Sequence, residues 1–392
     1  MSGTPDGAPT LLFINHWAGS LGGAEHSLLD IIARLSSPTR VHLVCSEQGV
    51  LTRRAEAHGA AVHVVPCRHS LILLKRDTLG KSIVHSWKAL FSFAWFVVRV
   101  ARVVRSVRPG AVHANVPKSH MTLMLLRRLG YRGPCLFHVR EIFSAGTLPF
   151  VLYRWLFPRT GAAVIAISSA VRDALPPVME RVATVIHNGV AVPSSLPHRR
   201  RHRAVRFIYL GRVVPWKGCH LLIDMFRTLY SRYAGDGISL SIIGDTLYWE
   251  QEYRGRLEAL ITCYGLAHAC RLLPNTEDPY GELSAHDVFC NASYQEPFGR
   301  SVAEAQACGL PVAAFSGGGI GEIVIHGTTG LLVDYGDAGA LAGACARFIE
   351  EPDLMAAMGA AGHARVKDLF NREVQIPGIG EFILKHARGR DG

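Results

Sequence analysis

The chain has 392 residues, 49% of them hydrophobic and 19% charged, which is typical of a well-buried globular protein with room for two domains. Its nine cysteines are odd in number and contain no C-x-x-C pair, so a disulfide framework or zinc ribbon is disfavoured and a reducing cytoplasm fits better. No apolar run reaches the roughly 18 residues of a membrane span. Residues 1–10 carry no signal-peptide pattern and are expected to form a loose tail.

Charge is distributed unevenly along the chain. Residues 1–200 contain 24 Lys and Arg against 9 Asp and Glu, whereas residues 201–392 contain 18 against 22. This asymmetry predicts an anionic partner for the first half. Because no nucleic-acid-binding motif is present, an anionic membrane surface is the preferred partner, and nucleic acid is not expected.

In chain order, short apolar runs alternate with helical patterns. Near-continuous apolar strands separated by helices predict a parallel sheet covered on both faces. In the first half, the expected strands are 10–17, 41–46, 61–66, 111–115, 135–140, 163–168 and 182–190.

A Pro-, Ser- and Arg-rich stretch, SSLPHRRRHR (194–203), interrupts this alternation, which then restarts at 206–211, 238–244, 270–274, 287–293, 311–315 and 330–334. The sequence therefore predicts an α/β chain of two doubly wound, Rossmann-like domains, with ligands at the carboxyl ends of their strands. The expected divisions are a domain at 11–193, a linker at 194–204, a domain at 205–370, and a helical segment at 371–392 that could cross back to the first domain.

Two strand-to-helix turns are candidates for binding anions. In SLGGAEHS (20–27), Gly22 and Gly23 would let backbone N–H groups approach an anion at a helix start, although a simple tight turn explains the pair equally well. In GRVVPWKG (211–218), Arg212 and Lys217 suit a diphosphate, because charge-assisted hydrogen bonds are strong, and a solvated loop is the alternative.

The stretch EPFGRSVAEAQACGLPV (296–312) places two carboxylates around a predicted helix start. The N–H groups of Phe298, Gly299, Arg300 and Ser301 could bind a phosphate at the positive end of the helix dipole. Glu304 could accept hydrogen bonds from a ribose diol, and Glu296 from sugar hydroxyls. The Gly run of SGGGIGEIV (316–324) permits a further nest of backbone donors.

These segments, together with FHVRE (137–141), AISSAV (166–171), IHNGV (186–190) and TGLLV (329–333), resemble the retaining glycosyltransferases of family four from Leu11 to about Phe370. The resemblance implies the GT-B fold: two Rossmann-like domains facing a central cleft. It implies transfer of a hexosyl group from a nucleotide sugar to a hydroxyl of a lipid-linked or cell-envelope glycan, without a metal or cofactor.

The resemblance also assigns roles to individual residues. Arg212, Lys217, Glu296 and His138 match catalytic positions, His138 as a cleft histidine that touches the donor sugar or acceptor. Gly22, Gly23, Asn275, Phe298, Gly299, Arg300, Ser301 and Glu304 match donor-binding positions, Asn275 through the turn that binds the base.

The chemistry is coherent, because cations and helix-end N–H groups stabilise the charge that grows on the departing diphosphate. No carboxylate is clearly placed as a nucleophile, so we favour departure and attack on the same face of the sugar. Three alternatives stay open: a two-carboxylate hydrolase using Glu296 and Glu304, a nucleotide-sugar epimerase of the same fold, and a non-catalytic, membrane-associated nucleotide-sugar binder.

The segment ALFSFAWFVVRVARVVRSVR (89–108) predicts an amphipathic helix. A Phe and Val stripe would pack on the first sheet, while Arg99, Arg102, Arg105 and Arg108 share the opposite side with Phe91 and Trp95. Arginines beside exposed aromatic rings suit an anionic bilayer, with a solvated face or an oligomer contact as alternatives. We therefore expect peripheral attachment on the cytoplasmic face of the membrane, extended by Lys75, Arg76, Lys81 and Lys88.

Overall fold

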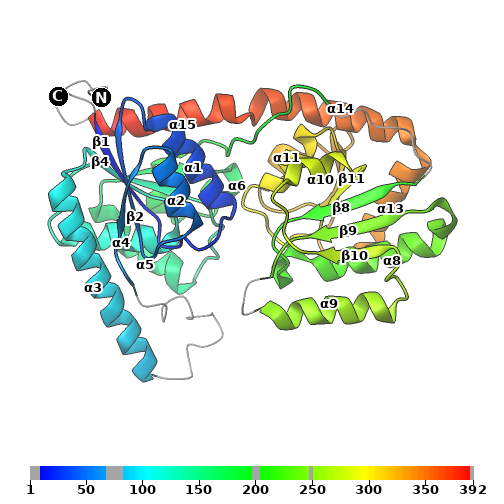
Figure 1. The fold of residues 1–392 in the computed structure, drawn as a ribbon, viewed down its shortest axis with the longest axis horizontal. Coiled ribbons are helices and arrows are strands. Elements are labelled where there is room, and N and C mark those ends of the chain that lie inside the picture. Colours follow the sequence, from blue (N-terminus) through cyan, green and yellow to red (C-terminus); the bar gives the residue numbers. More distant parts are fainter. Residues whose placement is uncertain (1–8, 68–82, 197–203, 247–249, 389–392) are drawn as a thin grey trace. The chain divides into compact units, whose positions relative to one another are not determined.

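A computed structural model describes residues 9–67, 83–196, 204–246 and 250–388, and it divides the chain into two compact units (Figure 1). Unit 1 comprises residues 1–167, 171–186 and 376–392, and unit 2 comprises residues 168–170 and 187–375. Each unit is built on one parallel sheet flanked by helices. The predicted fold class, an α/β chain of two doubly wound domains, is confirmed.

The sheet of unit 1 has the order β3-β2-β1-β4-β5-β6-β7, and that of unit 2 has the order β10-β9-β8-β11-β12-β13. In each sheet, successive strands are added first on one side and then on the other. This reversal lies between β1 and β4 in unit 1 and between β8 and β11 in unit 2. The strands are β1 (Thr10–Ile14), β2 (Arg40–Cys45), β3 (Ala61–Val64), β4 (Ala111–Ala114), β5 (Cys135–Val139), β6 (Ala163–Ala166), β7 (Ala183–Val185), β8 (Arg206–Leu210), β9 (Ser239–Ile243), β10 (Cys270–Leu273), β11 (Val288–Asn291), β12 (Val312–Phe315) and β13 (Gly330–Val333).

Helices α1–α12 lie in the connections between strands, whereas α13, α14 and α15 follow the last strand, β13. The helices are α1 (Gly23–Leu35), α2 (Val50–Ala57), α3 (Ile83–Val107), α4 (Pro117–Arg128), α5 (Leu148–Leu156), α6 (Ser169–Asp173), α7 (Pro177–Glu180), α8 (Cys219–Tyr233), α9 (Gln251–Cys263), α10 (Pro279–Ser284), α11 (Arg300–Ala307), α12 (Ile320–Ile323), α13 (Ala338–Glu350), α14 (Pro352–Leu369) and α15 (Arg372–Arg388).

Each unit has its own hydrophobic core, which explains why the strand signatures are nearly continuous. Every residue of β4, β5, β11 and β12 is buried, because helices cover both faces of the sheet. In unit 1, α15 contributes Ile376, Ile379 and Ile383 to the core at the spacing of one helical face. The C-terminal segment from Ile376 therefore belongs structurally to unit 1, whereas Arg372–Gln375 belong to unit 2.

Two of the expected divisions fall largely on residues that the structure does not describe. The tail at 1–10 lies outside the described residues except for its last two, and Thr10 already belongs to β1. The expected linker at 194–204 lies outside them at 197–203.

Helix α3 has the predicted amphipathic pattern. Phe96, Val97, Val100 and Val104 are buried, while Phe91 is 74% and Trp95 50% exposed. The guanidinium of Arg102 lies 5.8 Å from the Trp95 ring centroid, within the range of a cation–π contact. In the part of the chain that the structure describes, no helix combines the length and apolar character needed to cross a bilayer. Lys75, Arg76 and Lys81, and the side chain of Lys88, lie outside the described residues.

Candidate active site

In unit 2, the loops that carry the predicted site residues leave the sheet at its point of reversal. Strands β8 and β11 are neighbours, with Phe207 paired with Val288, and their carboxyl ends therefore lie side by side. The loop after β8 contains Arg212 and Lys217, and the loop after β11 contains Glu296. Ligands of doubly wound folds bind outside the carboxyl ends of strands at such a point.

Lys217 and Glu296, 79 positions apart in sequence, meet at this point of unit 2. The Lys217 ammonium donates a hydrogen bond to Oε2 of Glu296, and each side chain is only 11% exposed. The ring of Trp216 lies 4.3 Å from the ammonium nitrogen, and the carbonyl of Trp216 accepts a 2.9 Å hydrogen bond from the N–H of Tyr294. The two loops are thus joined by an ion pair and a backbone hydrogen bond.

The Gly run after β12 holds the Glu296 loop in place. Gly318 has φ +59°, and a Cβ there would lie 2.2 Å from the carbonyl oxygen of Glu296. The N–H of Gly319 donates a 2.7 Å hydrogen bond to the same carbonyl. Close packing of two backbones therefore explains the glycines, a structural role that the sequence analysis did not assign to them.

Helix α11 begins directly after Gly299, whose φ is +98°. Phe298 is 2% exposed and packs near Phe370, so only its backbone is available to a ligand. From the first residue of the helix, Arg300 Nε donates a 2.8 Å hydrogen bond to the carboxylate of Glu304, one turn further on, which is 12% exposed. Ser301 is partly exposed in the first turn. The helix start therefore presents backbone donors beside a positioned carboxylate.

The remaining predicted residues of unit 2 lie at the same edge of the sheet. Arg212 is exposed, and its side chain forms no hydrogen bond or ion pair with any other described residue. The N–H of Asn275, after β10, donates a 3.1 Å hydrogen bond to Asp245, after β9. No three His, Cys, Asp or Glu side chains gather closely enough to hold a metal ion within the described ranges.

In unit 1, Gly22 and Gly23 lie at the start of α1 as expected, but the backbone N–H of Gly22 already donates a hydrogen bond within the protein. The carboxylate of Glu25 accepts a 3.0 Å hydrogen bond from the N–H of Gly22. This contact caps the helix with a side chain of its own first turn.

His138, which the resemblance matches with a cleft histidine that touches the donor sugar or acceptor, is enclosed within unit 1. His138 belongs to β5 and is 0% exposed, with its ring 3.3 Å from Nη2 of Arg140. Burial, and then the charge of Arg140, lower the pKa of His138 well below its ordinary value, so the ring is neutral. The physical reason is that both faces of this central strand are covered. His138 therefore cannot touch a ligand in this structure.

Sequence reasoning missed a polar cluster where the sheet of unit 1 reverses. Asn15 follows β1 and Asn115 follows β4, and their side chains form a 3.0 Å hydrogen bond. Arg140, which follows β5, donates from Nε to Asn115 at 2.9 Å and from Nη2 to Ser27 at 3.1 Å. The signal was available, because Asn15, Asn115 and Arg140 are polar residues within or at the end of the expected apolar runs 10–17, 111–115 and 135–140.

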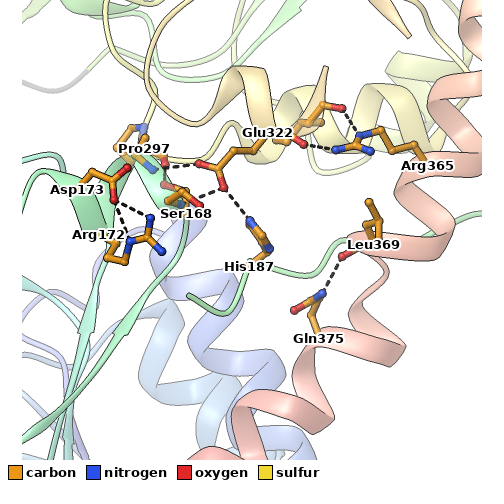
Figure 2. Close-up of polar contacts among 12 residues, drawn as sticks. Ser168, Arg172, Asp173, His187, Pro297, Glu322, Arg365, Leu369 and Gln375 are labelled. Atoms are coloured by element: carbon orange, nitrogen blue, oxygen red, sulfur yellow. Dashed lines mark hydrogen bonds and ion pairs between the residues drawn. The ribbon is translucent and has the colours of Figure 1, made fainter. Parts of the chain in front are cut away.

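A second cluster that sequence reasoning missed surrounds Glu322 of unit 2 (Figure 2). Its carboxylate accepts hydrogen bonds from the N–H groups of Ser169 and Ala170, at 2.9 and 3.0 Å, and from His187 Nε2 at 2.8 Å. Arg365 donates to the backbone carbonyl of Glu322 at 2.7 Å. Burial alone raises the pKa of Glu322, but these hydrogen bonds outweigh it and lower the pKa to about 2.

We expect the Glu322 cluster to make the free energy of unfolding depend on pH in the acidic range. Because the folded-state pKa is depressed from 4.5 to about 2, the contribution of Glu322 is complete above pH 4.5 and is lost as the pH falls toward 2. After allowance for solvent exposure, we expect Glu322→Gln to cost about 1–2 kcal/mol at pH 7.

Urea unfolding of both proteins between pH 7 and pH 2 measures this difference, with Glu252→Gln on exposed α9 as the control. A difference between the wild type and Glu322→Gln that stays constant down to pH 2 would contradict the assignment.

Comparison with known proteins identifies the family. A model described as "Glycosyltransferase Family 4" matches residues 21–192, and one described as "Glycosyl transferases group 1" matches residues 197–365. The chain belongs to the family-four glycosyltransferases. This transferase is an enzyme with relatives in cell-envelope polysaccharide biosynthesis.

Among these relatives, the capsular polysaccharide biosynthesis glycosyltransferase CapM of Staphylococcus aureus is 24% identical over 89% of the transferase and 92% of CapM. The lipopolysaccharide core biosynthesis glycosyltransferase LpsE of Rhizobium meliloti is 32% identical, over 42% of this chain and 45% of LpsE. The crystal structure of Anabaena HepE in complex with UDP and glucose matches with a TM-score of 0.79 at 25% identity, covering 96% of this chain and 99% of HepE.

Proposed function

We propose that this transferase moves a hexosyl group from a nucleotide-sugar donor to a hydroxyl of a cell-envelope glycan or glycolipid, with retention of anomeric configuration and without a metal ion. The Lys217–Glu296 pair beside the start of α11 is the observation that carries the proposal. The UDP and glucose bound by HepE support a uridine nucleotide sugar, and CapM and LpsE support an envelope acceptor.

In this proposal, different residues of unit 2 bind the diphosphate, the ribose and the transferred sugar of the donor. Arg212, Lys217 and the N–H groups that begin α11 stabilise the negative charge that develops on the leaving diphosphate. Glu304, held by Arg300, accepts hydrogen bonds from the ribose. Glu296 accepts hydrogen bonds from hydroxyls of the transferred sugar. Before the donor binds, the carboxylate of Glu296 pairs with the largely buried ammonium of Lys217 and neutralises its charge.

The family resemblance supports retention, and neither glutamate of the donor site in the described part of unit 2 is free to act as a nucleophile. Glu296 is paired with Lys217, and Glu304 with Arg300, so both carboxylates are engaged by cations. The acceptor hydroxyl therefore attacks the face that the diphosphate leaves. Its proton passes to an oxygen of the departing phosphate, which becomes basic as the glycosidic bond breaks. A hydrolase mechanism would need one carboxylic acid with a raised pKa.

Incubation of the full chain with UDP-, GDP- and ADP-sugars and a membrane lipid extract tests the proposal. Release of nucleoside diphosphate with label in a lipid or glycan, unchanged by EDTA and retaining the α configuration, is expected. An isomerised donor would instead identify an epimerase, and donor binding without turnover would identify a non-catalytic binder. Loss of turnover in EDTA with rescue by magnesium would overturn the metal-free mechanism.

We further propose that α3 attaches the enzyme peripherally to the cytoplasmic face of an anionic membrane, where the acceptor resides. The exposed rings of Phe91 and Trp95 would enter the interface, and each of Arg99 and Arg102 would add about 1 kcal/mol near anionic lipid. Residues 99–132 contain eight Lys and Arg and no Asp or Glu.

Vesicle sedimentation measures this attachment. Binding should require anionic lipid, weaken with added salt, and fall in both Arg99→Gln/Arg102→Gln and Phe91→Ser/Trp95→Ser. The exposed pair Arg53→Gln/Arg54→Gln on α2 is the matched control. Equal retention on neutral vesicles would rule the mechanism out.

A further inference from the structure

A cavity of about 290 Å³ lies in unit 1, between the C-terminal ends of α3 and α4 and the loop before β5. Its lining combines three arginines, Arg105, Arg108 and Arg132, with the apolar side chains of Val104, Leu126 and Leu129. The volume is close to the lower end of the range for small-ligand sites, about 300–1,000 Å³.

This cavity is separate from the polar cluster that follows β1, β4 and β5. Pro109 and Gly133 line it and lie two positions before the first residues of β4 and β5, so it lies at the amino ends of these strands. The cluster of Asn15, Asn115 and Arg140 follows the carboxyl ends of the same sheet. Residues 78–140 contain eleven Lys and Arg but no Asp or Glu, so no carboxylate of this segment neutralises the cavity.

Cations at helix C-termini also stabilise helix dipoles, and this is the competing explanation for the arginines. For α4, Arg127 and Arg128 already serve this purpose. Arg127 donates to the carbonyls of Tyr131 and Gly133 at 3.0 and 3.2 Å, and Arg128 donates to Met124 at 3.4 Å. By contrast, the side chains of Arg105 and Arg108 form no hydrogen bond or ion pair with any other described residue.

The backbone of Arg108 provides an independent argument. Arg108 has φ +50°, and it is the only non-glycine residue with positive φ in the part of the chain that the structure describes. It follows the last residue of α3, where its N–H donates to Val104 at 2.9 Å. Glycine adopts this conformation without strain, as Gly130 does just past the end of α4, with φ +95°. A strained arginine at this position points to a use for its side chain.

We propose that this cavity binds a phosphate monoester attached to an apolar or neutral group. Arg105, Arg108 and Arg132 supply the donors for the phosphate oxygens, and Val104, Leu126 and Leu129 contact the attached group. The same chemistry occurs in a soluble sugar or glycerol phosphate and in the headgroup of phosphatidic acid. The proposal is independent of the donor site and of transferase activity.

Calorimetry with sn-glycerol 3-phosphate, and sedimentation with phosphatidylcholine vesicles with and without phosphatidic acid, test the two sources. The full chain carrying Lys217→Ala is used, so that the proposed diphosphate site does not contribute. Arg108→Gly is the informative variant, because it removes the guanidinium while relieving backbone strain, and its thermal midpoint should be unchanged or higher. Arg128→Gln is the matched control, since it removes the same charge outside the cavity.

Arg108→Gly should weaken binding of at least one probe about tenfold or more, while Arg128→Gln leaves it unchanged. Binding of glycerol phosphate in solution would identify a soluble ligand, and binding only to vesicles with phosphatidic acid would identify the lipid. If neither probe binds, or if both variants lose the same affinity, the cavity is no phosphate site.

Discussion

Replacing Lys217 with methionine should reduce turnover about 10²- to 10³-fold at saturating donor, because the reaction loses one preorganised cation at the leaving diphosphate. The loss should appear in kcat, since the charge that Lys217 meets grows as the glycosidic bond breaks. Methionine retains most of the apolar stem that packs beside Trp216. Steady-state kinetics with the preferred donor gives the result.

The ion pair makes a stability control necessary. Without Lys217, the carboxylate of Glu296 is left largely buried and unpaired, which costs about 3 kcal/mol when the pair is well shielded. The double variant Lys217→Met/Glu296→Gln removes both charges. It should regain most of the lost stability in thermal unfolding, while its turnover should stay well below that of Glu296→Gln alone.

That divergence separates a catalytic cation from a structural one. If the double variant turned over as fast as Glu296→Gln, Lys217 would act only by holding the loops together. If the single variant kept full turnover at saturating donor, Lys217 would have no part in the chemistry.

The positions of the strands could largely be predicted from the sequence, and the reason is physical. Each of the thirteen strands of the structure overlaps an expected apolar run, because strands buried on both faces of a parallel sheet must be apolar almost throughout. The expected runs extend one or two residues too far at several strands, such as 10–17 against Thr10–Ile14. The extra residues, including Asn15 and His16, are the polar groups that follow the strand.

The same burial encloses His138, which was named as a ligand-contacting residue on the resemblance. A polar residue inside a covered strand looks like a residue of a cleft when only the sequence is read, and its packing against His113 and Arg140 depends on neighbouring strands. Arg140, directly after the strand, was the better candidate for a position at the edge of the sheet. The assignment of His138 rested on the resemblance alone. The position of each residue relative to the end of its strand would have favoured Arg140.

The pairing of Lys217 with Glu296 could not be predicted from local patterns, because 79 positions separate them. The doubly wound order was sufficient to predict that their loops leave adjacent strands. Which side chains then meet depends on close backbone packing, as at Gly318 against the Glu296 carbonyl. Sequence reasoning therefore found the loops but not the contact.

The contact sharpens the expected roles of the two glutamates. Glu304→Ala should weaken binding of the free nucleoside diphosphate about 10- to 100-fold, because a charge-assisted hydrogen bond to the ribose is worth roughly 1.5–3 kcal/mol. Calorimetry with UDP, GDP and ADP measures this loss. Arg300→Gln is the companion variant. It removes the hydrogen bond that positions the Glu304 carboxylate but leaves the carboxylate in place, so it should cause a smaller loss of affinity for the diphosphate.

Glu296→Ala should behave in the opposite way toward the free diphosphate. Removing its carboxylate frees Lys217 from the ion pair, so binding of the diphosphate alone should stay the same or become tighter. Turnover of the complete donor should fall, because the sugar loses its hydrogen-bond acceptor. Titration of the diphosphate and steady-state kinetics on the same preparation measure both quantities. If Glu296→Ala and Glu304→Ala lost diphosphate affinity equally, the division between a sugar-binding and a ribose-binding carboxylate would be wrong.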